Sequence, residues 1–127
     1  MSDLISKTEE YATELLSTKL DNRYLYHNLR HTQRVVKSTK ELLEHINLNA
    51  NENDALLVAA WLHDVGYTVS STNHEEHSAV LAKKFLENFS CPKEFIATVD
   101  CLILATKMEY EPNNLLEQII KDADCSH

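Results

Sequence analysis

Apolar side chains recur every three or four residues along most of the chain, which is the spacing of one face of an α-helix. A first stripe predicts a helix over residues 3–20, and a second predicts a long helix over residues 27–46. Residues 54–64 are apolar on nearly every side, which is typical of a central helix that other helices cover. Later stripes keep the same spacing, so every segment favours helix over strand.

Short polar stretches separate these helices and offer residues that can cap them. We expect Asn53 or Asp54 to cap the central helix, because a side-chain oxygen can accept from its first free N–H groups. A polar loop is predicted over residues 66–73. Near its end, Thr72 and Glu75 have the spacing of a capping box for a fourth helix.

The two prolines mark the last predicted helices. The fourth helix is expected to end near residue 88, Pro92 lies in the first turn of a fifth helix, and Pro112 opens a sixth. The whole chain has one glycine and two prolines, far fewer than turn-rich all-β folds need. We therefore predict an all-α fold of about six helices.

Length, charge and cysteine content narrow the classes of protein further. A chain of 127 residues is expected to form one domain, residues 1–127. The formal net charge of −8 argues against nucleic acid or an anionic membrane as the main partner. Three cysteines outside any CxxC spacing are typical of free thiols in a reducing compartment. Without a leader segment or a long apolar run, the expected location is the cytoplasm.

The central helix ends in an unusual way, with an imidazole and a carboxylate side by side. His63 and Asp64 follow eight apolar residues, and His31 lies on the apolar face of the preceding long helix. Imidazole and carboxylate groups at the rim of an apolar core suit a divalent cation. A single inward-facing histidine is more often a hydrogen-bonded core residue, but several such groups buried without a cation carry a large desolvation cost.

The order of these residues resembles the HD superfamily of metal-dependent phosphohydrolases. That family has a histidine, then a His-Asp doublet on a following helix, then a distant aspartate, which His31, His63-Asp64 and Asp124 match. The string Tyr26-His27-Asn28-Leu29-Arg30-His31 is also similar to the signature of cyclic-nucleotide phosphodiesterases, distant relatives in the superfamily. The resemblance covers about residues 24–127. It implies an all-α bundle whose metal sits between helices and activates water for attack on phosphorus.

Carried over by position, the resemblance implies that the metal ligands are His31, His63, Asp64 and Asp124. Asp124 is preferred to Asp122, because the residues after it match the closing motif of the family. The sequence leaves the cation open among Mn, Fe, Zn, Mg and Ni. It predicts one ion and leaves a second ion open.

The resemblance also implies residues that act on the substrate. Asp64 would orient the attacking water, and His27 falls where the phosphodiesterase signature has its proton donor. A histidine hydrogen-bonded to a carboxylate is an equally good interpretation of His27. His74, at the start of the fourth helix, is a further candidate for a direct role, as a metal ligand or a phosphate contact.

Phosphate contacts are expected from cationic or imidazole side chains. The candidates are His77, Arg34 and Lys107, although a solvated surface role is common for any single lysine or arginine. The predicted function is hydrolysis of a phosphomonoester or phosphodiester, of a nucleotide or another small phosphorylated metabolite. The alternative is a non-catalytic module that binds a metal or a nucleotide for regulation.

One departure from the family concerns the end of the chain. The sequence stops three residues after Asp124, whereas HD domains usually continue through further helices. We therefore expect a bundle without its usual C-terminal helices, an exposed apolar surface, and a tendency to form a homodimer.

Overall fold

The computed structural model describes the backbone of residues 2–18 and 22–125 and the side chains of residues 3–18 and 28–125. This part of the chain is all-helical, as predicted, with no strand. The elements, in chain order, are α1 (Ser2–Thr18), α2 (Asn22–Leu43), α3 (Ala50–Leu62), the short 3-10 helix η1 (Val65–Thr68), α4 (His74–Asn88), α5 (Lys93–Leu104) and α6 (Leu115–Cys125).

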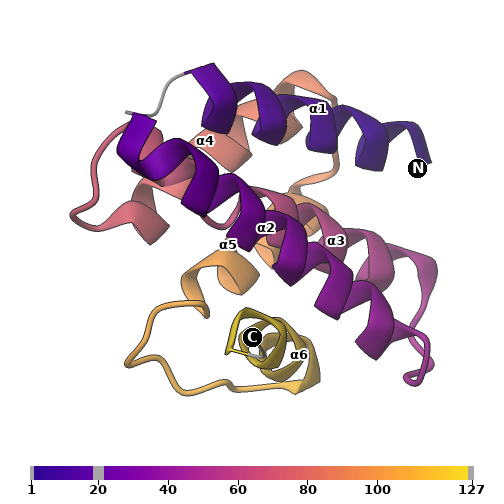
Figure 1. Ribbon diagram of the computed structural model, residues 1–127. Helices are drawn as coiled ribbons and strands as arrows, with labels where there is room; N and C mark the ends of the chain where they lie inside the picture. Colours follow the sequence, from indigo (N-terminus) through magenta and orange to yellow (C-terminus); the bar gives the residue numbers. More distant parts are fainter. Residues whose placement is uncertain (1, 19–21, 126–127) are drawn as a thin grey trace.

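Helix α3 lies at the centre of the bundle, with α1, α2 and α5 packed around it (Figure 1). Its apolar residues do not form a single stripe, so contact on several sides is needed to bury them. Leu56, Val58 and Leu62 are fully buried there. The predicted central helix is therefore confirmed, and its C-terminal end lies inside the protein.

The start of α3 differs from the prediction. The helix begins at Ala50 and is capped by Asn49, not by Asn53 or Asp54. The side chain of Asn49 accepts a hydrogen bond from the Glu52 N–H at 2.8 Å, and the Glu52 carboxylate accepts one from the Asn49 N–H at 3.1 Å. This complete capping box adds a turn to the helix, because each partner satisfies one otherwise free donor.

The start of α4 also differs from the prediction. Thr72 and Glu75 do not form the predicted capping box: α4 begins at His74, and Asn73 precedes it in the left-handed conformation, with φ of 55°. Asn tolerates that conformation better than most residues, so the chain turns sharply into the helix. The carboxylate of Glu75 faces the His74 ring instead, at 3.3 Å. The predicted loop over residues 66–73 includes all of η1 except Val65.

The other helix boundaries shift by a few residues. Helix α2 begins at Asn22 and ends at Leu43, earlier than the predicted 27–46. Helix α5 begins at Lys93, so Pro92 is its N-cap residue rather than part of its first turn as predicted. Helix α6 begins at Leu115 rather than at Pro112, because the Asn114 side chain accepts from the Glu117 N–H at 2.9 Å and forms the cap.

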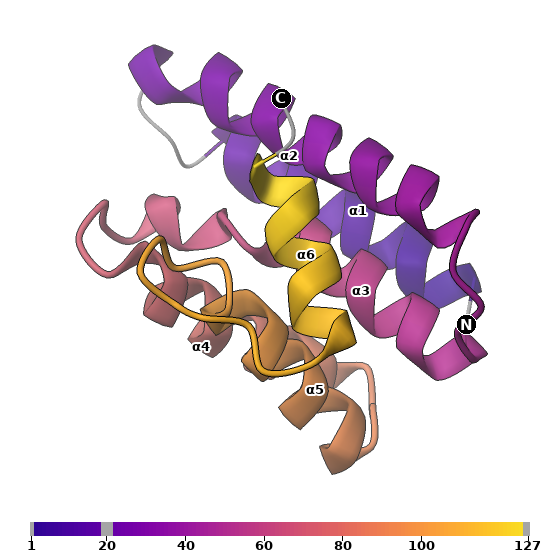
Figure 2. The same cartoon turned by 90° about the horizontal axis from the view of Figure 1, so that it is seen from below.

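Helix α6 packs on one side of the bundle and brings the end of the described chain to α2 (Figure 1). Figure 2 shows it running from the region of α5 up to α2, against which it packs most closely. Near its middle, the ammonium group of Lys121 donates to the backbone carbonyls of Lys107 at 2.5 Å and of Ala105 at 3.4 Å. Ala105 is the C-cap residue of α5 and Lys107 lies in the turn after it, so Lys121 joins α6 to the end of α5 one turn before Asp124.

Two properties of the surface bear on earlier expectations. None of the described helices combines the length and the apolar character needed to cross a bilayer. The most exposed large apolar side chains of the described part are scattered over several elements: Val69, Val80, Met108 and Leu115. The tendency to dimerise stays a prediction.

Candidate metal centre

The His63-Asp64 doublet lies where the chain leaves α3. His63 keeps helical dihedral angles, with φ of −64° and ψ of −23°, but Asp64 departs from them, with φ of −114° and ψ of 3°. Neighbouring side chains on a regular helix point about 100° apart. The change at Asp64 brings the two side chains together instead, and Nε2 of His63 lies 3.4 Å from Oδ2 of Asp64.

The ring of His63 is held in one orientation by its own helix. Nδ1 lies 2.8 Å from the Ala60 carbonyl oxygen, which can only accept, so Nδ1 carries the proton that it donates. Nε2 therefore points away from the helix, towards the carboxylates of Asp64 and Asp124, each 3.4 Å distant. The residue is 1% exposed, and Nε2 has no close hydrogen-bond partner among the described residues.

Two more side chains from distant parts of the sequence complete the cluster. His31, on α2, places Nε2 2.9 Å from Oδ1 of Asp124 on α6, and 3.7 Å from Oδ2 of Asp64. Donor atoms of His31, His63 and Asp124 all lie within 4.8 Å of one another. Asp122, the alternative ligand, is exposed and accepts a hydrogen bond from Gln118 at 2.7 Å.

These donors fit a divalent cation. Ligand atoms held about 2.0–2.2 Å from an ion lie roughly 3.0–3.6 Å from their neighbours, for tetrahedral or octahedral geometry. Nε2 of His63 has that spacing to both carboxylates. Its lack of a closer partner is explained if its lone pair serves an ion, because a buried polar atom otherwise needs a hydrogen bond. Two imidazoles with two carboxylates suit Mn, Fe, Zn or Ni.

Comparison with known proteins agrees with this geometry. Residues 28–127 match the family model of the HD domain. The chain belongs to the HD domain family. No curated protein and no solved structure matches it. HD domains bind divalent metals and are mostly metal-dependent hydrolases, and the matched residues include the whole cluster.

In this HD domain, the histidines and aspartates of the cluster stabilise the charged forms of one another. Burial would lower the pKa of His63, but the carboxylates of Asp64 and Asp124 outweigh it and raise that pKa to about 9. Burial opposes ionisation of Asp124 too, yet His31 and His63 hold its pKa well below the usual range. The pKa of Asp64 is lowered against burial by His63 and His74. Both carboxylates are therefore ionised near neutral pH, as metal ligands must be.

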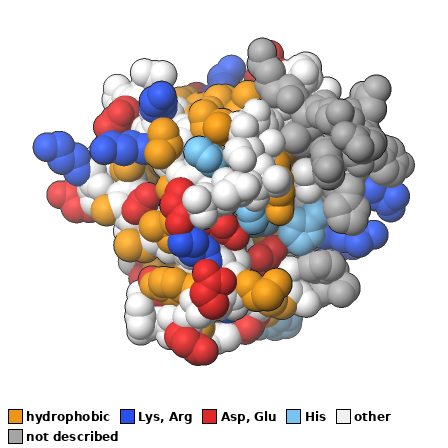
Figure 3. All heavy atoms as spheres, turned by 90° about the vertical axis from the view of Figure 1, so that its left-hand side faces the viewer, with side chains coloured by type: hydrophobic (Ala, Val, Ile, Leu, Met, Phe, Trp, Pro, Cys, Tyr) orange, Lys and Arg blue, Asp and Glu red, His pale blue; other side chains and the backbone are white. Residues whose placement is uncertain are grey.

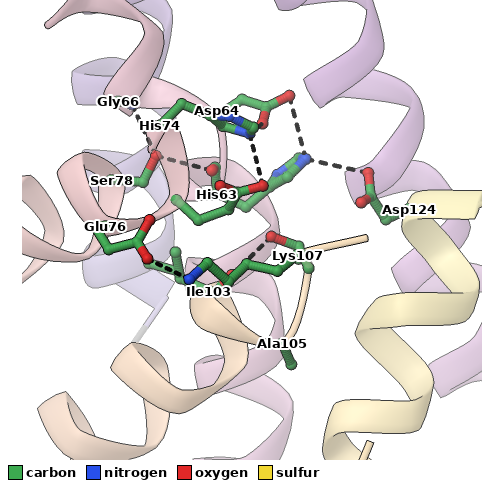
Figure 4. Close-up of polar contacts among 12 residues, drawn as sticks. His63, Asp64, Gly66, His74, Glu76, Ser78, Ile103, Ala105, Lys107 and Asp124 are labelled. Atoms are coloured by element: carbon green, nitrogen blue, oxygen red, sulfur yellow. Dashed lines mark hydrogen bonds and ion pairs between the residues drawn. The ribbon is translucent and has the colours of Figure 1, made fainter. Parts of the chain in front are cut away.

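His74 occupies the other side of Asp64. Its Nε2 lies 3.2 Å from Oδ1 of Asp64 and 3.3 Å from Oε2 of Glu75, and its ring stacks on Tyr67 at 4.0 Å between centroids. Burial opposes the charged ring, but the hydrogen bond to Asp64 and the charges of Asp64 and Glu75 together outweigh it, so the pKa of His74 is raised. Asp64 thus stands between His63 and His74, with one carboxylate oxygen towards each ring (Figure 4).

The HD-domain centre opens to solvent on one side. The side chains of His31 and Asp124 are 22% and 20% exposed, whereas His63 is enclosed. On the face seen from the start of α2, histidine side chains reach the surface among acidic and basic ones (Figure 3). His31 and Asp124 are thus the solvent-facing members of the cluster, and His63 is the enclosed one.

The predicted substrate residues have different positions. Lys107 follows α5 and forms an ion pair with Glu76 of α4, which raises the pKa of the lysine and lowers that of the glutamate. Arg34 is exposed on α2, one turn after His31. For His77 on α4, no described polar side-chain contact joins it to the cluster. The side chain of His27 lies outside the described residues.

Sequence reasoning missed three neighbours of the centre. Tyr67, which stacks on His74, stands three residues after Asp64 in a stretch similar to the HD superfamily, but nothing in the sequence indicated its contact with His74. The spacing of Glu75 from Thr72 predicted a capping box, whereas its carboxylate lies beside the His74 ring. Glu76, the partner of Lys107, looked like an ordinary surface charge at the start of a helix.

Proposed function

We propose that this chain is a metal-dependent phosphohydrolase that hydrolyses a phosphomonoester or phosphodiester of a small metabolite, such as a nucleotide. One observation carries the proposal above all. The buried Nε2 of His63 lies 3.4 Å from two ionised carboxylates and has no closer partner among the described residues. Membership of the HD family supports the same conclusion.

The cation would be held by His31, His63, Asp64 and Asp124. When bound, such an ion supplies Lewis acidity, which lowers the pKa of water and offsets charge on phosphoryl oxygens. The protein's own contribution is to hold the donors in place before binding. The Ala60 carbonyl orients the His63 ring, and groups fixed in advance lose little entropy when the ion arrives.

Asp64 and His74 are the residues placed for proton movement. Asp64 Oδ1 lies 3.2 Å from Nε2 of His74, so the carboxylate can hold the ring in place for proton donation. The raised pKa of His74 favours the protonated ring, which can donate a proton to a leaving oxygen. The ring is 17% exposed, which allows substrate to reach it. His27 remains the alternative proton donor on sequence grounds.

Substrate phosphate would meet the cationic side chains near this opening. Lys107 already faces the negative charge of Glu76, and the field of Glu75, the neighbour of His74, also acts on it. Arg34 and His77 are further contacts proposed from the sequence. The net charge of −8 disfavours long polyanions, so we propose a small cytoplasmic substrate whose phosphate meets a local positive charge.

Hydrolysis of a panel of phosphate esters with added Mn²⁺ tests this function. Wild-type protein should release phosphate or nucleoside monophosphate from at least one ester, and His63→Ala should not. His45→Ala is the matched control, because His45 is exposed and distant in sequence from the cluster. Equal rates for wild type and His63→Ala would contradict the proposal. Metal binding by the wild type without turnover of any ester would indicate a non-catalytic module instead.

A further inference from the structure

Ser78 has a hydroxyl group in an unusual position for a helical serine. It lies on α4, one turn after His74, and is completely buried. Its Oγ accepts a hydrogen bond from the Gly66 N–H at 2.8 Å and donates one to the His63 carbonyl oxygen at 2.8 Å. Figure 4 shows Ser78 between these two residues. The hydroxyl therefore joins α4 to the turn that follows α3.

The two backbone groups that Ser78 binds stand on either side of Asp64. The His63 carbonyl precedes Asp64 directly, and the Gly66 N–H follows it after one residue. At this point the chain leaves the helix, and Asp64 has the dihedral angles that turn its carboxylate towards His63. Fixing both sides of this short segment fixes the direction of the carboxylate between the rings of His63 and His74.

Gly66 makes this arrangement possible. A Cβ atom at residue 66 would lie 2.0 Å from the His74 carbonyl oxygen and 2.6 Å from the Ser78 nitrogen. The turn thus rests directly on the backbone of α4, with no room for a side chain. The only glycine of the chain stands here, and the close approach requires it because glycine has no Cβ atom.

We propose that Ser78 is a positioning residue of the metal centre, which sets the orientation of the Asp64 carboxylate through the His63 carbonyl and the Gly66 N–H. This inference rests on the proposed metal site. It assigns a role to a residue that touches neither the ion nor the substrate. Partners behind a ligand commonly contribute about 10–100-fold to metal affinity.

The test compares Ser78→Ala with Thr8→Val, which also removes one buried hydroxyl. Thr8 is fully buried, and its hydroxyl donates to the Leu4 carbonyl at 2.7 Å on α1, a helix that supplies no ligand. Both variants should lower the urea midpoint, because each loses a buried hydrogen bond. Titration with Mn²⁺, followed by the EPR signal of the free ion, then measures metal affinity in both.

We expect Ser78→Ala to weaken Mn²⁺ binding about tenfold or more, and Thr8→Val to leave it within about twofold of wild type. Ser78→Cys keeps a weak donor and acceptor, should give an intermediate affinity, and serves if the alanine variant does not fold. Equal affinities for Ser78→Ala and wild type would overturn the role of Ser78 alone. A wild-type protein that binds no Mn²⁺ would overturn the metal site and this role together.

Discussion

Nε2 of His31 lies 2.9 Å from Oδ1 of Asp124, although 93 positions separate the two residues in the chain. The contact exists because α6 packs along α2, with Lys121 tying α6 to the end of α5. An ion pair that is fully exposed to solvent usually contributes little to the free energy of unfolding. Here the pair lies beside the buried ring of His63, so both residues belong to the candidate metal centre.

This contact predicts that Asp124 and Asp122 differ sharply as metal ligands. Asp124→Asn should weaken Mn²⁺ binding by at least the ~100-fold that outer partners of a ligand can contribute. Asp122→Asn is the control, since its exposed carboxylate accepts only from Gln118 among described polar contacts. Calorimetric titration of both variants measures the difference. A larger loss in Asp122→Asn would show that the closing aspartate was wrongly assigned.

Metal affinity should depend on pH through His63. Its pKa is raised to about 9, so the ring holds a proton that a bound cation must displace. Apparent affinity should therefore rise with pH, by up to about tenfold per unit for each proton displaced, and level off above pH 9. Titrations at several pH values measure this slope. An affinity that does not change between pH 6 and pH 9 would contradict the proposed role of the ring.

Above pH 6.5 the metal-free protein should lose stability as the pH rises, whereas metal affinity should increase. The folded pKa of His63, about 9, exceeds its ordinary value of 6.5, so its stabilising effect is complete below pH 6.5 and is lost as pH rises through 9. The lowered pKa values of Asp64 and Asp124 give stability above pH 3.8 that is lost on acidification. Urea unfolding in the presence of a chelator should show maximal stability between these limits.

Gly66→Ala should destabilise the protein and disturb the metal centre together. The added Cβ would meet the His74 carbonyl at 2.0 Å, and backbone atoms cannot move aside as a flexible side chain can. We expect a loss of about 3 kcal/mol in the free energy of unfolding, the upper range for overpacking. Ser71→Ala, at an exposed position in the following loop, is the control and should change it by less than about 0.5 kcal/mol.

Lys107→Met should impair substrate binding more than turnover. If the ammonium group contacts substrate phosphate, its loss should raise KM about tenfold, which corresponds to ~1.4 kcal/mol of binding free energy. The exposed Lys84→Met is the charge-matched control. Steady-state kinetics on the preferred ester separates KM from kcat. A fall in kcat alone would place Lys107 in the chemical step rather than in substrate binding.

Much of this fold could be predicted from the sequence because its helices carry clear apolar patterns. The centrality of α3 followed from residues 54–64, which have no polar face. Helix starts were predicted less well, because several nearby residues could serve as caps. Helix α3 is capped by Asn49 rather than by Asn53, and α6 is capped by Asn114 instead of beginning at Pro112. Such choices depend on local backbone geometry, which the residue types alone do not determine.

The candidate site, like the fold, was predicted in part from the sequence. The doublet, His31 and the preference for Asp124 over Asp122 came from the resemblance to the HD superfamily, and in the structure the side chains of His31, His63, Asp64 and Asp124 lie close together. The positions of Tyr67 and Ser78 were not available, because they depend on how closely α4 approaches the turn at Gly66. The closeness of that approach depends on packing between helices, which the pattern of residues along one helix does not determine.

The stoichiometry of metal binding by wild type, His63→Ala and His45→Ala tests the proposed metal centre most directly. The groups around Nε2 of His63 should hold a divalent cation. Titration of the metal-free proteins with Mn²⁺, followed by EPR, should give about one tightly held ion per chain for wild type and His45→Ala, as expected for one set of four protein ligands. His63→Ala should bind none at the same concentrations. Equal binding by His63→Ala and wild type would contradict the account.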